Sequence, residues 1–349
     1  MCPLTHTGAP AAPPKGAARV LLPGPAMDPL SRVALLLCLL FATTLPGCPG
    51  GPSWDEAFDA SDDCALFSVW GSAPDDVWVV GGDAQAAQIF HFDGAWSEVE
   101  APAVPLLAWV YGWGADDAVA VGLDGGMARW DGNTWESMDT GQTQDLWGVW
   151  GVGPDDFWVV GGTVGEAGPV LLHWDGDALV DVGLPPDANT RDITALFKVW
   201  GIGDRVFATG EAGQIVSWDG ATWSAMAGGP RADQDFVSLW GTSPDAIVAV
   251  GGRGNARVAE FDGSAWSTIA PEGVGGLNGV FMDQEDMAVV GGISGFVGVY
   301  HPSTDELVAE DILGTEDLHA VWGDGEGRYY AVGGRLSEPF HGLAVVRTE

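Results

Sequence analysis

The sequence predicts an all-β protein folded as a seven-bladed β-propeller with four-stranded blades. The first observation is a phrase of apolar residues closed by an aromatic residue and a glycine, which recurs every 39–41 residues with one interval of 50. Short strands repeated every 40–50 residues or so are typical of propeller blades. The second observation is that the same turn residues separate the strands in each repeat. The third is the count of 18 Trp, whose large rings suit sheets that bury both faces against their neighbours.

Each repeat opens with an innermost strand, strand A, that ends at the closing position of this phrase, here called the anchor. The anchors are Gly71, Gly112, Gly151, Gly201, Gly241, Met282 and Gly323. A turn follows, for example at residues 73–76, where Pro presets φ for a type I turn and Asp accepts backbone hydrogen bonds. Strand B is rich in β-branched and aromatic residues, as at 77–80, and ends at a glycine pair in five repeats.

Strand C, as at residues 89–92, ends at an Asp-Gly step, which favours hairpin turns that need positive φ. Strand D opens with an aromatic residue in most repeats and with Leu in two divergent ones. These opening residues are Trp96, Trp135, Leu179, Trp223, Trp266 and Leu307. The Trp residues next to the anchors are expected to fill the core between blades, because large rings suit a wedge that widens away from the axis. They are Trp70, Trp150, Trp200, Trp240 and Trp322.

The seventh repeat lacks a fourth strand of its own. Its strand C falls at residues 343–346, and the sequence ends at Glu349. Trp54 lies 17 residues before Gly71, and in other repeats the strand-D Trp precedes the next anchor by 16–18 residues. We therefore expect the N-terminal strand around Trp54 to close the last blade and to cover its free edge. The predicted propeller spans residues 53–349.

The N-terminal part is interpreted as a targeting segment that is not part of the propeller. Residues 1–26 are rich in Pro, Ala and Gly and are compatible with an overlong gene start, whereas 27–47 combine a basic residue, a short apolar run and a Leu-x-Gly ending. Together with Cys48 this ending resembles the bacterial lipobox. The resemblance implies a lipoprotein signal peptide, lipidation of Cys48, a tether at 48–52 and a place in the cell envelope, at the outer membrane or extracellular face. The alternative is ordinary signal cleavage nearby, with Cys48 an incidental thiol.

Composition excludes several classes of protein. The chain has 13 Lys and Arg against 49 Asp and Glu, a formal charge of −36. A nucleic-acid binder needs basic residues to displace counterions, so nucleic acid is not an expected partner. Four Cys in 349 residues do not make a disulfide-stapled scaffold, and Cys64 is expected to be a small buried residue.

Several features of the repeat resemble known propeller families. A strand closing on Gly-Gly, an aromatic residue at the end of strand C and a Trp opening strand D are similar to the kelch repeat. The Asp131–Trp135 and Asp219–Trp223 steps look like part of the Asp-box turn of sialidase-type propellers. The whole ring is similar to secreted bacterial lipoprotein propellers. The resemblance implies the fold, whereas propellers host many unrelated activities.

In an antiparallel meander, the connections between strands alternate between the two ends of the ring. The A–B and C–D turns share one end, and their many Asp residues make that face acidic. The B–C and D–A loops share the other end, vary more in length, and are where binding specificity usually resides. We take this second face as the recognition face, with five candidate binding residues; the alternative is that they only offset local acidity. They are Arg191, Arg231, Arg253, Arg257 and Arg335.

No catalytic motif is present in the sequence. The innermost strands hold no Arg and one Lys, Lys198, so the arginine cluster of a sialidase-type site is missing. There is no His-x-x-x-His, Gly-x-Ser-x-Gly or phosphate-loop motif. No metal site and no cofactor are assigned, and Ca²⁺ at the acidic face is the alternative.

These observations favour an envelope-anchored, monomeric, non-enzymatic module that binds a protein or a glycan at the cell surface and touches the membrane only through its lipid. The alternative is a carbohydrate-active hydrolase or lyase of the sialidase-like propeller type. A purely structural envelope component is a third reading.

Overall fold

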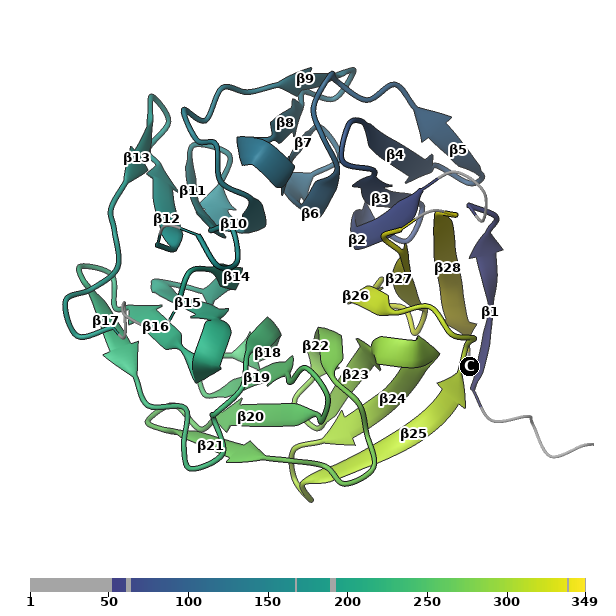
Figure 1. Cartoon of the computed structure of the whole chain (residues 1–349). Helices are drawn as coiled ribbons and strands as arrows, with labels where there is room; N and C mark the ends of the chain where they lie inside the picture. The colour runs from purple at the N-terminus through teal and green to yellow at the C-terminus, as the bar shows by residue number, and fades with distance from the viewer. Residues whose placement is uncertain (1–51, 61–63, 167, 189–192, 338, 349) are drawn as a thin grey trace, which may run out of the picture. The chain divides into compact units, whose positions relative to one another are not determined.

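The computed structural model describes residues 52–60, 64–166, 168–188, 193–337 and 339–348. The signal region, Cys48, Arg191 and most of the 48–52 tether lie outside the described residues. No helix within the described ranges is long and apolar enough to cross a membrane. The described chain forms seven antiparallel four-stranded sheets arranged around one axis (Figure 1).

Each sheet is a meander whose strands run outward from the axis in the order A to D, as the sequence predicts. The first blade comprises β2 (Ala65–Ala73), β3 (Asp76–Gly82), β4 (Ala87–Phe92) and β5 (Trp96–Val99). The second comprises β6 (Leu107–Gly114), β7 (Asp117–Gly122), β8 (Met127–Trp130) and β9 (Trp135–Ser137). The third comprises β10 (Leu146–Gly153), β11 (Asp156–Gly161), β12 (Val170–Trp174) and β13 (Leu179–Asp181).

The next three blades repeat this order. The fourth comprises β14 (Leu196–Ile202), β15 (Arg205–Gly210), β16 (Ile215–Trp218) and β17 (Trp223–Met226). The fifth comprises β18 (Phe236–Ser243), β19 (Ala246–Gly251), β20 (Arg257–Phe261) and β21 (Trp266–Ile269). The sixth comprises β22 (Leu277–Gln284), β23 (Met287–Gly292), β24 (Phe296–His301) and β25 (Glu306–Ile312).

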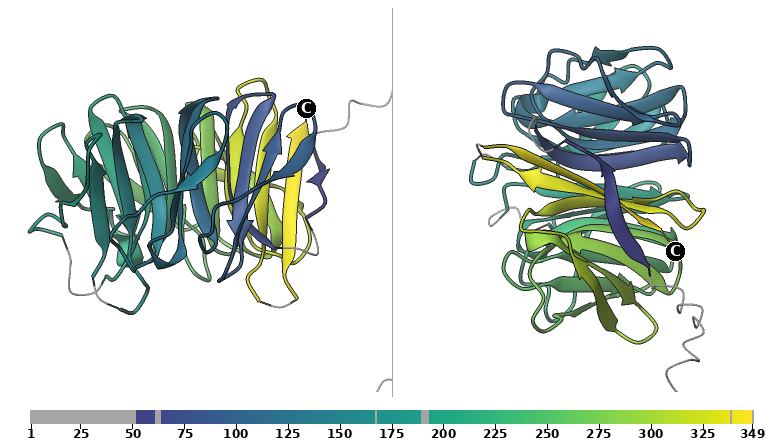
Figure 2. Two further views of the ribbon diagram at one scale, coloured as in Figure 1. Left: turned by 90° about the horizontal axis from the view of Figure 1, so that it is seen from above. Right: turned by 90° about the vertical axis from the view of Figure 1, so that its right-hand side faces the viewer.

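The seventh blade is built from both ends of the propeller. Its inner strands are β26 (Leu318–Gly323), β27 (Tyr329–Arg335) and β28 (His341–Thr348), and its outer strand is β1 (Ser53–Phe58). Trp54 of β1 is paired with Arg347 of β28, and Figure 2 shows β1 crossing the outside of this blade. The Trp54 indole Nε1 donates to a Glu310 Oε2 3.0 Å away, and the same carboxylate accepts from Arg347. This network ties β1 to blades six and seven.

In five of the seven seams the blades are joined by a contact between the anchor aromatic and the glycine at the anchor of the next blade. A Cβ on Gly112 would lie 2.5 Å from Cη2 of Trp70, and one on Gly71 would lie 2.6 Å from Cη2 of Trp322. Gly is needed at these positions because the ring of the preceding blade occupies the space of a side chain. Trp70 and Trp322 are each 7% exposed, so the rings belong to the core as predicted.

Neighbouring blades alternate in how strand B joins strand C. Blades two, four and six use a short 3₁₀ turn: η1 (Leu123–Gly125), η2 (Glu211–Gly213) and η3 (Ile293–Gly295). The middle residue of each is left-handed, with φ between 51° and 56°. Its backbone N–H in each case donates to an Asp side chain of a D–A loop, Asp145, Asp235 or Asp317. These Asp residues therefore fasten the loops at the end of the ring where the B–C connections lie.

We call the end formed by the A–B and C–D turns the turn face, and the end formed by the B–C and D–A connections the loop face. On the turn face Gly132 of the Asp131–Gly132 step has φ +89°, and Asp131 accepts from the amides of Asn133 and Thr134. The amide of Thr134, followed by that of Asn133, lowers the pKa of Asp131. The turn aspartates thus have a structural role.

Candidate functional site

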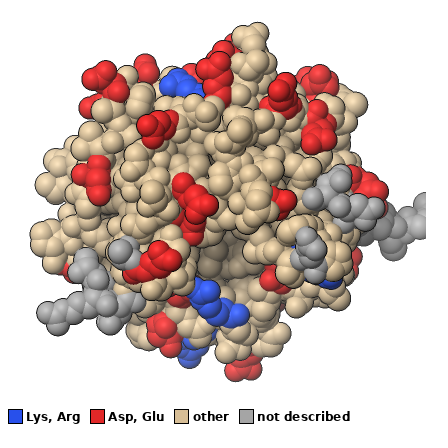
Figure 3. All heavy atoms as spheres, turned by 45° about the horizontal axis from the view of Figure 1, so that its top comes forward, with Lys and Arg blue, Asp and Glu red and all other residues tan. Residues whose placement is uncertain are grey.

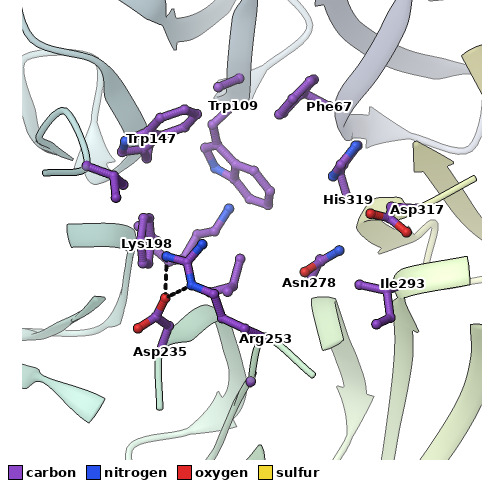
Figure 4. A pocket seen from close by; sticks show the side chains of 15 residues that line it. Phe67, Trp109, Trp147, Lys198, Asp235, Arg253, Asn278, Ile293, Asp317 and His319 are labelled. Atoms are coloured by element: carbon purple, nitrogen blue, oxygen red, sulfur yellow. Dashed lines mark hydrogen bonds and ion pairs between the residues drawn. The ribbon is translucent and has the colours of Figure 1, made fainter. Parts of the chain in front are cut away.

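A cavity of about 380 Å³ lies on the propeller axis and opens at the loop face (Figure 4). We call it the axial pocket. Every blade contributes the residue four positions before its anchor. These seven residues are Phe67, Ala108, Trp147, Phe197, Val237, Asn278 and His319. Apart from Ala108, which is buried, they are half-exposed, so the ring offers mostly apolar and aromatic surface to a ligand.

A repeated irregularity of strand A aims these side chains at the axis. The register between strands A and B shifts at this one position in all seven blades, for example between Leu66 and Ser68 in β2 and between Leu196 and Lys198 in β14. A β-bulge leaves one residue without a partner opposite it and redirects its side chain. Phe67 and Phe197 are those residues in β2 and β14, so the bulge turns a sheet residue into a pocket residue.

Contacts between neighbouring blades, and one contact within blade three, hold part of this ring in place. Phe67 stacks on His319 with ring centroids 4.4 Å apart and planes 5° apart. The Trp147 indole donates to the Gly162 carbonyl at 2.9 Å, and the Asn278 amide donates to the Leu318 carbonyl at 2.9 Å. Burial lowers the pKa of His319, which favours its neutral form. The pocket wall is therefore preorganised and carries little charge.

Lys198 stands out among the groups inside the pocket. It follows Phe197 on β14, is 5% exposed, and its Nζ lies 2.7 Å from the ring centroid of Trp109. Burial lowers the pKa of the Lys198 ammonium well below its ordinary value of 10.5. The eight ion pairs within the described residues use Arg or His, and none includes Lys198. A cation–π contact with Trp109 is thus its stabilising interaction.

One ion pair lies at the mouth of the pocket. Asp235 Oδ2 accepts from Arg253 Nε, with N and O 2.5 Å apart, while Oδ1 accepts from the Ala212 amide at 3.0 Å. The Arg253 side chain is 64% exposed. Figure 3 shows Lys or Arg atoms beside the central hollow of the loop face, with Asp or Glu atoms both beside the hollow and further out. The loop face is therefore acidic as well, and the expected separation of charges between the two faces is incomplete.

The structure separates the five Arg candidates. Arg253 lines the axial pocket, whereas Arg257 is 9% exposed and bonds to Asp233 and to carbonyls of its own loop region. Arg335 pairs with Glu316, and Arg231 is exposed with its carbonyl accepting from Arg257. Arg191 lies outside the described residues. Among the described candidates, Arg253 alone reaches the pocket.

The sequence did not predict that seven strand-A residues form a ring around the axial pocket, or that the Lys198 side chain points into that pocket. Lys198 was noted as the single basic residue of the innermost strands, but ligand contacts were expected in the loops. A signal was available, because Phe67, Trp147 and Phe197 share one offset from their anchors. The repeat predicts that these residues are equivalent. The β-bulge that points their side chains at the axis does not change the spacing of the repeats, so the spacing does not reveal it.

The buried ammonium is expected to reduce the stability of the unliganded protein. Because the folded-state pKa of Lys198 lies below 10.5, folding disfavours its charged form, at a cost of about 1.4 kcal/mol for each pH unit of lowering. This cost is complete below the folded pKa and disappears as pH rises toward 10.5. Lys198→Met should therefore raise the free energy of unfolding at pH 7. Urea titrations should show the difference from the unchanged protein shrinking as pH rises toward 10.5.

On the turn face, ionisable side chains pair within their own blades. His91 lies 2.6 Å from Asp76 and His173 lies 2.8 Å from Asp156, each His stacked on a Trp of its blade. Within the described residues no three His, Cys, Asp or Glu side chains gather as a metal site would require. Cys64 is buried, as predicted.

No protein-family model matches the chain, and no curated protein matches it. Solved structures share its architecture. YCF48 from Cyanidioschyzon merolae superposes with a TM-score of 0.63 at 12% identity, over 85% of this chain and 98% of that one. YCF48 bound to D1 peptide gives 0.58 at 11%, over 86% and 97%, and the WD40 β-propeller domain of Doa1 gives 0.62 at 10%, over 85% and 97%. The chain is therefore a β-propeller of this general architecture.

Proposed function

We propose that this protein is a non-enzymatic scaffold of the cell envelope that binds a segment of another protein in the axial pocket. The observation that carries the proposal is the ring of seven bulged residues, one from each blade, around a cavity of about 380 Å³. All seven blades aim a side chain at one point, which is an arrangement for holding a ligand. Trp147, Phe197 and Phe67 offer the flat apolar surface that anchors protein partners.

The similar propeller YCF48, which has been determined with a D1 peptide, supports a peptide as the class of ligand. The formal charge of −36 disfavours anionic polymers as partners. The absence of a catalytic motif from the sequence favours binding over turnover.

A random peptide library displayed on phage tests this function. We expect the full chain to enrich a consensus that contains an aromatic or aliphatic residue, and Trp147→Ala to lose at least tenfold in affinity for it. Val152→Ala, at a residue that is 61% exposed on the turn face, is the control and should bind normally. Enrichment that is equal for Trp147→Ala would reject the axial pocket, and binding on a glycan array with no peptide consensus would replace the partner class.

Anchoring at the envelope rests on the Leu-x-Gly-Cys ending at Cys48 and is part of the proposal. In a bacterial host fed an alkyne fatty acid, the unchanged chain should acquire the label and fractionate with membranes. Cys48→Ser should lose the label and appear in the soluble fraction. Equal labelling of both proteins would show that Cys48 is not the acylated residue.

A further inference from the structure

Lys198 has no assigned role in the fold that explains its burial. Only 5% of its surface is exposed, and its side chain points into the axial pocket. No carboxylate of the described residues forms an ion pair with it. In the equivalent position the other blades have Ser68, Trp109, Gly148, Ser238, Gly279 and Ala320. An apolar residue is thus accepted at this site in the ring, and the fold itself does not require a cation there.

We propose that the axial pocket recognises its protein partner through a carboxylate, which forms an ion pair with the Lys198 ammonium beneath Trp109. The proposal rests on the proposed function and names the group by which the partner is recognised. A buried charge without a counter-charge is costly, and a ligand carboxylate would supply one where little water competes. The aromatic wall from Trp147 and Phe197 would hold the apolar part next to that carboxylate.

The charges around the pocket favour a ligand with one negative charge over a ligand with two. Besides Lys198, the ionisable groups lining the pocket are Asp235, Arg253, Asp317 and His319. Arg253 is paired with Asp235, Asp317 accepts from the Ser294 amide, and burial favours neutral His319. Among the described lining residues, Lys198 is thus the one cation without a carboxylate in contact with it. Because Asp235 and Asp317 already match the two lining cations in number, a carboxylate at Lys198 adds one net negative charge to the pocket, whereas a phosphate dianion adds two.

Binding and protonation of Lys198 are coupled. Because burial lowers the pKa of the ammonium, a carboxylate that binds the protonated form must raise it. The affinity for a carboxylate should therefore fall as pH rises through the Lys198 pKa. The coupling gives a direct readout at the proposed contact itself.

Lysine is rare enough in this chain for a single signal to report on the site. The sequence contains two Lys, Lys15 and Lys198, so a Lys15→Arg protein labelled with ¹³Cε-lysine gives one resonance. Benzoate is the first probe, with neutral benzamide as its isostere and inorganic phosphate as the competing anion. We expect benzoate alone to shift the Lys198 resonance saturably and to raise its pKa. An unchanged pKa at saturating benzoate, or an equal response to phosphate, would overturn the proposal.

Three peptides distinguish the source of the carboxylate. N-acetyl-Ala-Ala-Phe carries a terminal carboxylate, its C-terminal amide carries none, and N-acetyl-Ala-Glu-Phe-amide carries one on a side chain. We expect one or both acidic peptides to bind and the neutral one to bind at least tenfold more weakly. Lys198→Met should remove that preference, while circular dichroism verifies its folding. Lys198→Gln repeats the test with a polar neutral side chain.

The outcomes separate this proposal from the proposed function. Library-derived peptides that bind the unchanged chain and Lys198→Met equally would keep a peptide pocket and reject the carboxylate contact. A benzoate response at Lys198 without any peptide consensus would keep an anion site and reject the peptide-binding function.

Discussion

Removing residues 50–60 is expected to destabilise the propeller by more than about 3–5 kcal/mol, the cost of deleting one large buried aromatic side chain. The deletion takes away β1, including Trp54, which is 8% exposed. It also frees the hydrogen-bonding edge of β28, to which β1 is paired from Ser53 to Phe58. A typical domain is stable by about 5–15 kcal/mol, so this loss brings the protein close to unfolding at 37 °C.

Urea denaturation followed by tryptophan fluorescence measures the effect. A variant that begins at residue 50 keeps β1 and is the matched control, with an expected midpoint equal to that of the longer chain. Trp54→Ala isolates the indole, whose Nε1 donates to Glu310, and should account for a large share of the loss. A deleted protein with an unchanged midpoint and slope would show that β1 adds nothing to the seventh blade. The newly exposed edge should also promote aggregation.

The architecture could be predicted from the sequence because each blade repeats the same turn residues and the same packing residues. Asp-Gly steps such as Asp131–Gly132 specify hairpins, and the anchor aromatic with its glycine specifies inter-blade contact, as Trp70 against Gly112 shows. These are constraints between residues close in sequence or one repeat apart. Copying them seven times multiplies the signal, so the number of blades and the order of strands follow.

The site is less readable because it depends on how seven repeats differ. Arg257 and Lys198 are both basic residues of a mainly acidic chain, yet one bonds within its own loop region and the other points into the axial pocket. Their environments are set by strand register and by the neighbouring blades. The repeat places Lys198 and Trp109 at the same position in their own blades but does not show that the two side chains meet. Lys198 also costs stability where small or apolar residues occupy the equivalent places, as a binding site often does.

Trp78→Ala is expected to cost about 3–5 kcal/mol of unfolding free energy because it leaves a cavity in the core between blades one and two. Trp78 is 1% exposed and stacks on His91 at 3.8 Å between ring centroids. It also meets two rings of the next blade, Trp130 at 4.8 Å and Trp135 edge-on at 5.4 Å. One truncation therefore removes contacts within a blade and between blades. Its loss should reduce the cooperativity of the ring as well as its stability.

The same cluster recurs two blades later, which supplies an internal replicate. Trp158 is 6% exposed, stacks on His173 at 4.2 Å, and meets Trp218 and Trp223 of blade four at 5.2 and 5.0 Å. Trp158→Ala should therefore cost about as much as Trp78→Ala. Trp78→Phe should cost less than Trp78→Ala, because the Phe ring refills most of the cavity that Ala would leave.

Val152→Ala, at an exposed side chain, is the control for these Trp variants and should change stability by no more than about 0.5 kcal/mol. Urea midpoints for the set give the comparison directly. If Trp78→Ala unfolded at the midpoint of Val152→Ala, the rings between blades would not be the source of stability, and the inter-blade core would have to be sought nearer the axis. If instead the two Trp→Ala variants differed by several kcal/mol, the odd-numbered blades would not be equivalent, and the seam nearer the weaker cluster would be where the ring opens first.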